Sequence, residues 1–436
     1  MSDHLVVIFA YHYPPENAVG GLRPARFAKY LSRLGYSCRV ITAADQNGRN
    51  DPNTVYIPDP FETGTRRGFG WQVERAIRKV FLPGEMGMRW SYRAARAARK
   101  LIRAHQREYP GARVTILSTF PQLGTLLAGW QLSHLSGIRW IADFRDPLSE
   151  ERAARGAYLQ RRAYRWLERA AVRSAGAVIA NTDAAKARLR EKYPSREEKV
   201  RVIWNGFDPE ERVVPLPTGS GECRVMSHTG ELYAGRSAAP VVESMARLMA
   251  AGRLTAASVR VRFIGRAAEG ALPTKALVNR ARAEGWLELV AEQIPRREAL
   301  WTAQSSDYLL LLQPRSATQV PGKLFEYLQI GRPILAFLER NSPSDRVLAQ
   351  AGVPYRCVYT GDRPSIVDDI VADFFKLPST AIEPNPWFEE QFNAERQTRQ
   401  LDAILRSLHD EPVRQANPAP ATRAAPGAPR LSKSSS

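Results

Sequence analysis

The residues best placed to do chemistry lie in the segment 320–338, where Lys323 and Glu326 stand three residues apart. In a helix this spacing puts both side chains on one face. A helix N-terminus offers unpaired N–H groups and the positive end of its dipole, so it attracts phosphate. Lys323 beside the Gly322 amide would suit a diphosphate, and Glu326, one turn deeper, would suit the vicinal hydroxyls of a ribose. Alternatively, Glu326 only complements the helix dipole and Lys323 is solvated.

The same segment carries the signals that would hold these side chains in place. Pro321 suits a first helical position, because its missing N–H would be unpaired there anyway. Gly331 can adopt the left-handed conformation that ends a helix, and Pro333 prevents the helix from continuing. Residues 334–338 form an apolar run of strand length. The segment therefore predicts a helix over 322–330 followed by a buried strand.

Strand-like and helix-like patterns alternate along nearly the whole chain. Such alternation is typical of parallel sheets covered by helices on both faces. A turn-forming cluster at 205–209 and a Pro- and Gly-rich stretch at 213–221 interrupt it. We expect an α/β fold of two doubly wound, Rossmann-like domains facing a central cleft, followed by an amphipathic helix and a disordered tail. The expected boundaries are 1–212 and 213–385 for the domains, 386–410 for a C-terminal helix that packs back toward the first domain, and 411–436 for the tail.

Composition narrows the class of protein. The three cysteines of this 436-residue chain are scattered, and neither they nor the six histidines have metal-ligand spacing. This favours a reducing compartment and no bound metal. The chain runs from Met1 directly into an apolar strand, and no apolar run is long enough to span a bilayer. We expect a cytoplasmic protein that is not integral to a membrane.

The net charge of +19 and the pI near 10.1 call for an anionic partner. Nucleic acid, an anionic membrane surface and a phosphorylated substrate all qualify. Much of the excess lies in 66–107 and 152–173, and five basic residues fall on one side of a predicted helix: Arg93, Arg96, Lys100, Arg103 and Arg107. This is either a solvated face or a patch that lies on the inner face of the membrane. No nucleic-acid-binding motif accompanies the charge, so nucleic acid ranks last.

Six ordered blocks make nearly the whole chain resemble a known family. They are YHYPPENAVGG (11–21), ADFRDP (142–147), ANTD (180–183), IWNGFD (203–208), TGELYAGR (229–236) and the segment 320–338. In these blocks the chain resembles GT-B glycosyltransferases of the family 4 type, a bacterial group that elongates polysaccharides and modifies glycans. The resemblance implies a nucleotide-sugar donor held mainly by the second domain and a glycan or lipid-linked acceptor held mainly by the first.

The resemblance also implies roles for single residues. Glu326 matches the acid that binds the donor ribose. Arg236 stands where such enzymes place a basic residue on the diphosphate, and Lys323 would supply a second cation. Gly265 and Ile294 follow strands where the backbone meets the nucleotide and grips the base. Gly20 and Gly21 lie in the loop after the first strand. They would let the backbone approach donor phosphate or acceptor, or they only make this loop flexible.

Two departures from the family pattern concern the reacting centre. Relatives often carry two glutamates separated by seven residues, and the position of the first is Thr318 here. Many relatives also place a histidine where Arg145 stands. Arginine is always protonated at neutral pH, so it cannot act as a base. It could bind a phosphate or a sugar hydroxyl, oriented by Asp143 or Asp146, or form an internal ion pair that shapes the loop.

No Asp-x-Asp motif occurs in the sequence, which argues against a divalent cation on the diphosphate and suits the GT-B form. Arg236, Lys323 and helix-terminal amides would then stabilise the leaving group. The family's stereochemistry implies retention of the anomeric configuration, with the departing phosphate assisting the incoming hydroxyl. No cofactor is expected beyond the nucleotide-sugar, which is a co-substrate.

Three other functions compete with this interpretation. A nicotinamide-dependent oxidoreductase would need a Gly-x-Gly-x-x-Gly turn after the first strand, and residues 10–15 exclude it with Pro14 and Pro15. A nucleotide-sugar epimerase of GT-B fold would use the donor without an acceptor. A non-catalytic, anion-binding scaffold stays open because Thr318 and Arg145 replace expected residues.

Overall fold

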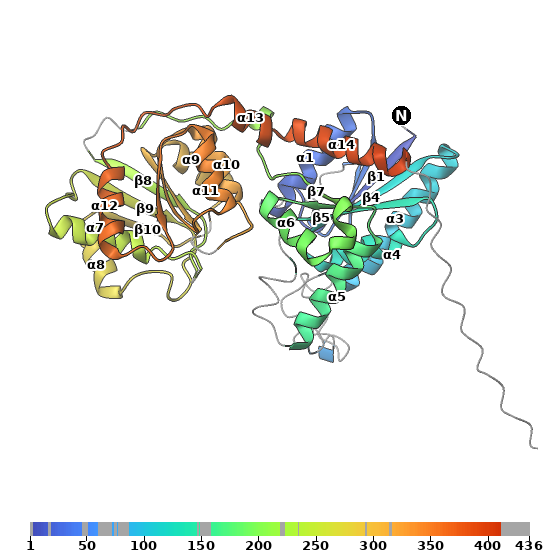
Figure 1. The fold of residues 1–436 in the computed structure, drawn as a ribbon, viewed down its shortest axis with the longest axis horizontal. Coiled ribbons are helices and arrows are strands. Elements are labelled where there is room, and N and C mark those ends of the chain that lie inside the picture. Colours follow the sequence, from blue (N-terminus) through green and yellow to red (C-terminus); the bar gives the residue numbers. More distant parts are fainter. Residues whose placement is uncertain are drawn as a thin grey trace, which may run out of the picture.

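The structure is a computed structural model of two lobes, each built on one parallel sheet (Figure 1). It describes residues 3–15, 19–45, 51–59, 72–73, 76, 87–145, 148, 158–218, 223–233, 235–292, 294–313 and 316–410. The tail predicted over 411–436 lies outside these residues. None of the helices in the described ranges is long and apolar enough to cross a membrane.

The sheet of the first lobe has seven strands in the order β3-β2-β1-β4-β5-β6-β7. The strands are β1 (His4–Ala10), β2 (Ser37–Thr42), β3 (Thr54–Tyr56), β4 (Arg113–Phe120), β5 (Ile138–Phe144), β6 (Ala177–Ala180) and β7 (Val200–Val202). The helices are α1 (Leu22–Arg33), α3 (Met88–Glu108), α4 (Leu123–Ser133), α5 (Tyr158–Ser174) and α6 (Asp183–Lys192), with short 3-10 turns η1 (Val19–Gly21), η3 (Pro194–Lys199) and η4 (Pro209–Glu211). Every residue of β1 is buried, because this strand lies between β2 and β4 with helices on both faces.

The sheet of the second lobe has six strands in the order β10-β9-β8-β11-β12-β13. The strands are β8 (Arg224–Thr229), β9 (Val259–Ile264), β10 (Leu287–Val290), β11 (Tyr308–Gln313), β12 (Ile334–Leu338) and β13 (Tyr355–Tyr359). The helices are α7 (Ala239–Ala250), α8 (Lys275–Ala283), α9 (Arg296–Gln304), α10 (Gly322–Ile330), α11 (Pro343–Ala351) and α12 (Pro364–Phe374). Both sheets reverse their strand order beside the first strand of the lobe, so the predicted α/β fold of two doubly wound sheets is confirmed.

Two further helices return the chain to the first lobe: α13 (Pro386–Phe392) and α14 (Ala394–Asp410). Figure 1 shows α13 between the lobes and α14 lying on the first lobe next to α1. Leu401 and Leu405 of α14 are fully buried in the cluster that contains Val6 and Phe27. The acceptor and donor roles predicted for the two domains stay predictions at this stage.

The structure has two helices where the sequence predicted one over 386–410. The helix breaks at Asn393, which lies in a non-helical conformation and accepts a hydrogen bond from the Glu395 amide through Oδ1 at 2.8 Å. Backbone bonds to the first lobe fix the break: Phe207 N–H donates to Phe392 O at 3.0 Å, and Ala394 N–H donates to Phe207 O at 2.9 Å. The amphipathic pattern continues through the break, because both helices bury one face.

Candidate active site

A cleft of about 620 Å³ lies between the two lobes. Its walls come from α1 and residues 203–213 on one side, and from the loop after β8, α9 and α10 on the other. This volume is in the range of small-molecule sites, which are often formed at domain interfaces. Seven of the predicted site residues line it: Arg145, Arg236, Gly265, Ile294, Gly322, Lys323 and Glu326.

Helix α10 has the bounds that the sequence predicted, 322–330, with one difference at its start. Pro321 is the N-cap and not the first helical residue, since its ψ of 139° is extended. Gly331 ends the helix in the left-handed conformation, with φ +73°. Because Gly322 and Lys323 are the first two residues of the helix, the positive end of the dipole opens into the cleft.

Lys323 is held against the end of β8 and is not a solvated side chain. Its Nζ donates to Thr229 O and lies 3.4 Å from His228 Nε2. Burial, together with repulsion from Arg236, lowers the pKa of Lys323 to about 7. His228 is fully buried and bonds Leu310 O through Nδ1 at 2.8 Å. Burial and the nearby Lys323 hold the pKa of His228 well below its ordinary value, so its neutral Nε2 faces the ammonium as an acceptor.

Arg236 completes the cationic side of the cleft. Its backbone and that of Tyr233 exchange hydrogen bonds of 2.6 and 3.2 Å, and its guanidinium lies 5.2 Å from the centroid of the Tyr233 ring. Among the residues that the structure describes, no acceptor reaches the buried Nε of Arg236. An unpaired buried donor is costly. A donor left in this state at the wall of a cleft is suited to an anionic ligand.

Two glycines keep the backbone close together beside these cations. Gly265 follows β9 with φ +134°, and a Cβ on it would stand 2.6 Å from Gly230 O. Gly230 has φ +128°, and a Cβ added to it would stand 2.7 Å from Lys323 Nζ. Such φ values are accessible to glycine and strained for other residues. Side chains at these positions would displace Lys323 and the β8 loop.

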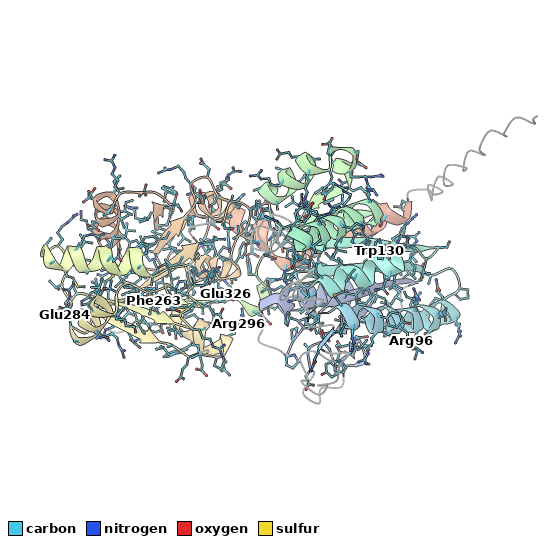
Figure 2. All side chains as sticks on the ribbon, turned by 90° about the horizontal axis from the view of Figure 1, so that it is seen from below. Arg96, Trp130, Phe263, Glu284, Arg296 and Glu326 are labelled. Carbon is cyan, nitrogen blue, oxygen red and sulfur yellow. The ribbon has the colours of Figure 1, made fainter. Side chains whose placement is uncertain are left out.

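Glu326 pairs with Arg296, the first residue of α9, with 2.5 Å between Oε1 and the guanidinium. Figure 2 shows the two side chains together on the part of the second lobe that faces the first. Glu326 lies beyond the first turn of α10, so it does not serve mainly to complement the dipole. Ile294 lines the cleft two residues before Arg296. The sequence analysis did not single out Arg296, although a basic residue at a helix start beside Ile294 was the available signal.

On the opposite wall, the Arg145 guanidinium donates to Gly20 O. Gly20 and Gly21 form the end of η1, and neither is among the residues that line the cleft. A Cβ on Gly21 would stand 2.9 Å from Tyr13 Cα, so this glycine serves close backbone packing. Asp146, the other predicted partner of Arg145, lies outside the described residues.

Asp143 does not orient Arg145, contrary to one of the sequence-based alternatives. Both of its oxygens accept hydrogen bonds of 2.9 Å from Arg23 of α1. Arg23 also donates to Ile203 O at 2.9 Å and to Trp204 O at 2.7 Å. This buried arginine therefore ties α1 and β5 to the start of the crossing between the lobes. The sequence analysis missed it, because its partner stands 120 residues away.

No group of three or more His, Cys, Asp or Glu side chains is placed to hold a metal ion within the described ranges. The arrangement instead gathers two cations, a helix N-terminus and a carboxylate within one wall of the cleft. Chemically, this wall can hold a diphosphate and a neighbouring diol.

Residues 24–211 match the model of Glycosyltransferase Family 4. A sucrose-phosphate synthase from Thermosynechococcus elongatus is 13% identical, with 93% of this chain and 99% of that chain covered and a TM-score of 0.59. HepE of Anabaena, solved with UDP and glucose, is 14% identical, with 93% of this chain and 100% of that chain covered and a TM-score of 0.58. A UDP-forming trehalose-phosphate synthase from Burkholderia vietnamiensis is 13% identical, with 94% of this chain and 99% of that chain covered and a TM-score of 0.58. Comparison with curated protein sequences gives no match.

At this level of identity, the likeness to the solved structures establishes the fold, and the predicted GT-B form is confirmed. The family match lies in the first lobe, and the recognition of family 4 from the ordered sequence blocks is confirmed there. The chain is therefore similar to glycosyltransferases in two respects, the family match over 24–211 and the GT-B fold of both lobes.

Proposed function

We propose that this protein transfers a sugar from a nucleotide-diphosphate donor to a hydroxyl of a glycan or lipid-linked acceptor, with retention of configuration and without a metal ion. The observation that carries the proposal is the unpaired, buried Nε of Arg236 at the cleft wall that also holds Lys323 and the start of α10. Support comes from HepE, solved with UDP and glucose, and from a starch synthase of Arabidopsis thaliana bound to ADP.

The donor would lie along the second lobe. Its diphosphate would accept hydrogen bonds from Arg236, Lys323 and the Gly322 amide, where Gly265 leaves room for the backbone to approach. The ribose hydroxyls would donate to Glu326, whose charge Arg296 already neutralises in part. The base would contact the main chain at Ile294.

The chemistry would rest on stabilising the leaving group. As the bond between the anomeric carbon and the phosphate oxygen breaks, negative charge grows on the diphosphate, and Arg236 and Lys323 would stabilise it. The acceptor hydroxyl would attack from the same face and lose its proton to the departing phosphate oxygen. Two carboxylates of the cleft already have partners. Glu326 pairs with Arg296, and Asp208 accepts hydrogen bonds from Lys29 and Tyr30. They are therefore poor nucleophiles. Detection of a covalent glycosyl-enzyme would contradict this mechanism.

The acceptor would be held by the first lobe. Arg145 lines the cleft there, and as a permanent cation it would bind an acceptor or sugar oxygen and not remove its proton. Asp146, which precedes Pro147 in the same sequence block, is proposed to assist it. We propose that the acceptor belongs to polysaccharide biosynthesis. The protein would then act in the cytoplasm, either free or bound peripherally to the inner face of the membrane.

A screen of labelled nucleotide-sugars, each with and without acceptor extracts, tests the function. We expect transfer that depends on the acceptor, and Arg236→Ala should reduce kcat at least a hundredfold, by analogy with the loss of one donor to a developing anion. Arg282→Ala on the exposed side of α8 is the matched control and should behave as the wild type. Conversion of a donor sugar in the absence of any acceptor would favour the epimerase. If calorimetry detected no binding of any nucleoside diphosphate, the result would favour the non-catalytic scaffold.

A further inference from the structure

The first lobe carries a layer of three adjacent helices, α3, α4 and α5, on one face of its sheet. Helix α4 packs against both others, and Trp130 of α4 meets Trp166 of α5 with ring centroids 5.7 Å apart. In Figure 1, α4 and α5 lie on the lower side of the first lobe with α3 to their right, whereas α13 lies between the lobes at the top. Figure 2 views the molecule from below and labels Trp130 on α4 and Arg96 on α3.

The outward side of this layer is unusually cationic. Seven basic residues of α3 are exposed: Arg89, Arg93, Arg96, Arg99, Lys100, Arg103 and Arg107. Five basic residues of α5 are exposed: Arg161, Arg162, Arg165, Arg169 and Arg173. The two helices contain only two acids. Glu108 ends α3, and Glu168 of α5 is buried and pairs with Lys192.

Large apolar side chains stand among these cations. Tyr92 of α3 is 66% exposed, and Tyr158 and Trp166 of α5 are 59% and 55% exposed. Leu159 is also exposed, and the Arg162 guanidinium donates to the Tyr158 hydroxyl at 3.0 Å. Arginine mixed with tryptophan, tyrosine and leucine on one helix face is the pattern of helices that lie at a membrane surface. We call these exposed residues of α3 and α5 the basic-aromatic face.

A purely solvated face does not explain this pattern. Like charges four residues apart destabilise a helix, and α5 repeats them at Arg161, Arg165, Arg169 and Arg173. Helix α14 of the same chain shows the ordinary solvated arrangement. There, Arg399 pairs with Glu395, and Arg406 pairs with Asp402, each at spacing i,i+4. On α14 an acid stands one turn from each of these arginines, whereas the arginines of α5 at 161, 165, 169 and 173 have only one another at that spacing.

We propose that the basic-aromatic face of α3 and α5 docks this protein on an anionic lipid bilayer. The arginines would meet the phosphates of the lipid headgroups, and Trp166, Leu159 and Tyr158 would enter the headgroup region. In Figure 1, α3 and α5 lie away from α13, which lies between the lobes. The proposal does not depend on the transfer reaction.

Vesicle flotation without any sugar donor tests the proposal. The purified protein should float with vesicles of phosphatidylcholine and phosphatidylglycerol, and it should stay behind with phosphatidylcholine alone. The triple variant Arg162→Gln, Arg165→Gln, Arg169→Gln should bind the anionic vesicles about a hundredfold more weakly, at roughly fivefold for each charge near the surface. The control Lys275→Gln, Arg282→Gln, Arg346→Gln removes three exposed charges from the second lobe and should bind as the wild type.

A second variant separates the apolar contribution. The pair Leu159→Ser, Trp166→Ser should lower the binding that survives in high salt, where screening weakens the arginines. Circular dichroism and the melting temperature confirm that each variant is folded. Equal flotation of the wild type and the arginine variant, or no flotation with anionic vesicles, would overturn the proposal. Salt-sensitive binding to RNA without vesicle binding would assign the face to nucleic acid and would overturn it as well.

Discussion

Donor binding should weaken as the pH rises, by the free energy needed to protonate Lys323. The pKa of this ammonium is about 7 in the free protein, because it is buried and faces Arg236. A bound diphosphate would bring negative charge next to Nζ and keep the lysine charged. At about pH 8.5 the free lysine is mostly neutral, and protonating it costs about 2 kcal/mol at 1.36 kcal/mol for each pH unit above the pKa. The dissociation constant should therefore be about thirtyfold higher at that pH than near pH 6.

Calorimetry gives a direct measure of the proton. A nucleotide-diphosphate sugar is a suitable probe, because its diphosphate carries the same charge over this pH range. Titrations in two buffers of different ionisation enthalpy should report the uptake of about one proton on binding near pH 8.5, and almost none near pH 6. Lys323→Met should remove both the proton uptake and the pH dependence. Lys323→Arg should remove the pH dependence while it keeps a cation, since arginine is always protonated.

The reasoning would be refuted by one clear result. If the wild type bound the donor equally at both pH values and took up no proton, the diphosphate would not lie at Lys323. A pH dependence that persisted in Lys323→Met would point to another titrating group, and His228 would be the first to examine, since it lies 3.4 Å from the same Nζ.

Three further substitutions test other parts of the cleft and its frame. Glu326→Gln should raise the donor dissociation constant about tenfold or more, since a hydrogen bond to a charged group contributes about 1.5–3 kcal/mol, and calorimetry would show no change if Glu326 does not meet the ribose. Gly265→Ala should cost about 1–3 kcal/mol in urea unfolding, because its φ is +134° and the new Cβ would meet Gly230 O, whereas Gly270→Ala has open space and serves as the control for positive φ. Arg23→Met should cost about 3–5 kcal/mol in urea unfolding, because it leaves Asp143 buried and unpaired. Arg33→Met, in an exposed pair with Glu210, should leave the urea midpoint near that of the wild type, and similar losses in the two variants would mean that the Arg23 network contributes little.

Where local signals are strong, the sequence predicts the fold closely. Helix α10 ends where Gly331 and Pro333 predict, because a left-handed glycine followed by proline stops a helix. Its start follows Pro321. The break between α13 and α14 had a weaker local signal, Asn393, whose side chain accepts a hydrogen bond from the Glu395 amide. It also depends on hydrogen bonds between residues 392–394 and Phe207, which lies nearly 200 residues earlier in the chain.

The same distinction applies to the site. Lys323 and Glu326 were singled out because one helical turn joins them, and Gly265 because it follows a strand, and all three line the cleft. Arg296 and His228 were missed, because their partners come from other elements of the second lobe. Asp143 was one of two partners that sequence proximity offered for Arg145, whereas its partner in the structure is Arg23 of α1. Sequence proximity predicts partners within an element and fails for pairs that the sheet order creates.

The two departures from the family pattern meet at one place, and this bears on the scaffold alternative. Asn181 Nδ2 donates to Arg145 O, and the neighbouring Thr182 hydroxyl donates across the lobes to Thr318 O at 2.6 Å. Thr318 is buried there, so a glutamate would put a carboxylate into the contact between the lobes, at a high desolvation cost unless it were paired. The changes at 145 and 318 therefore belong to one junction between the lobes, and neither replaces Arg236, Lys323 or Glu326. Since the residues suited to the diphosphate and ribose are all present, the departures argue for a different sugar or acceptor geometry more than for a loss of chemistry.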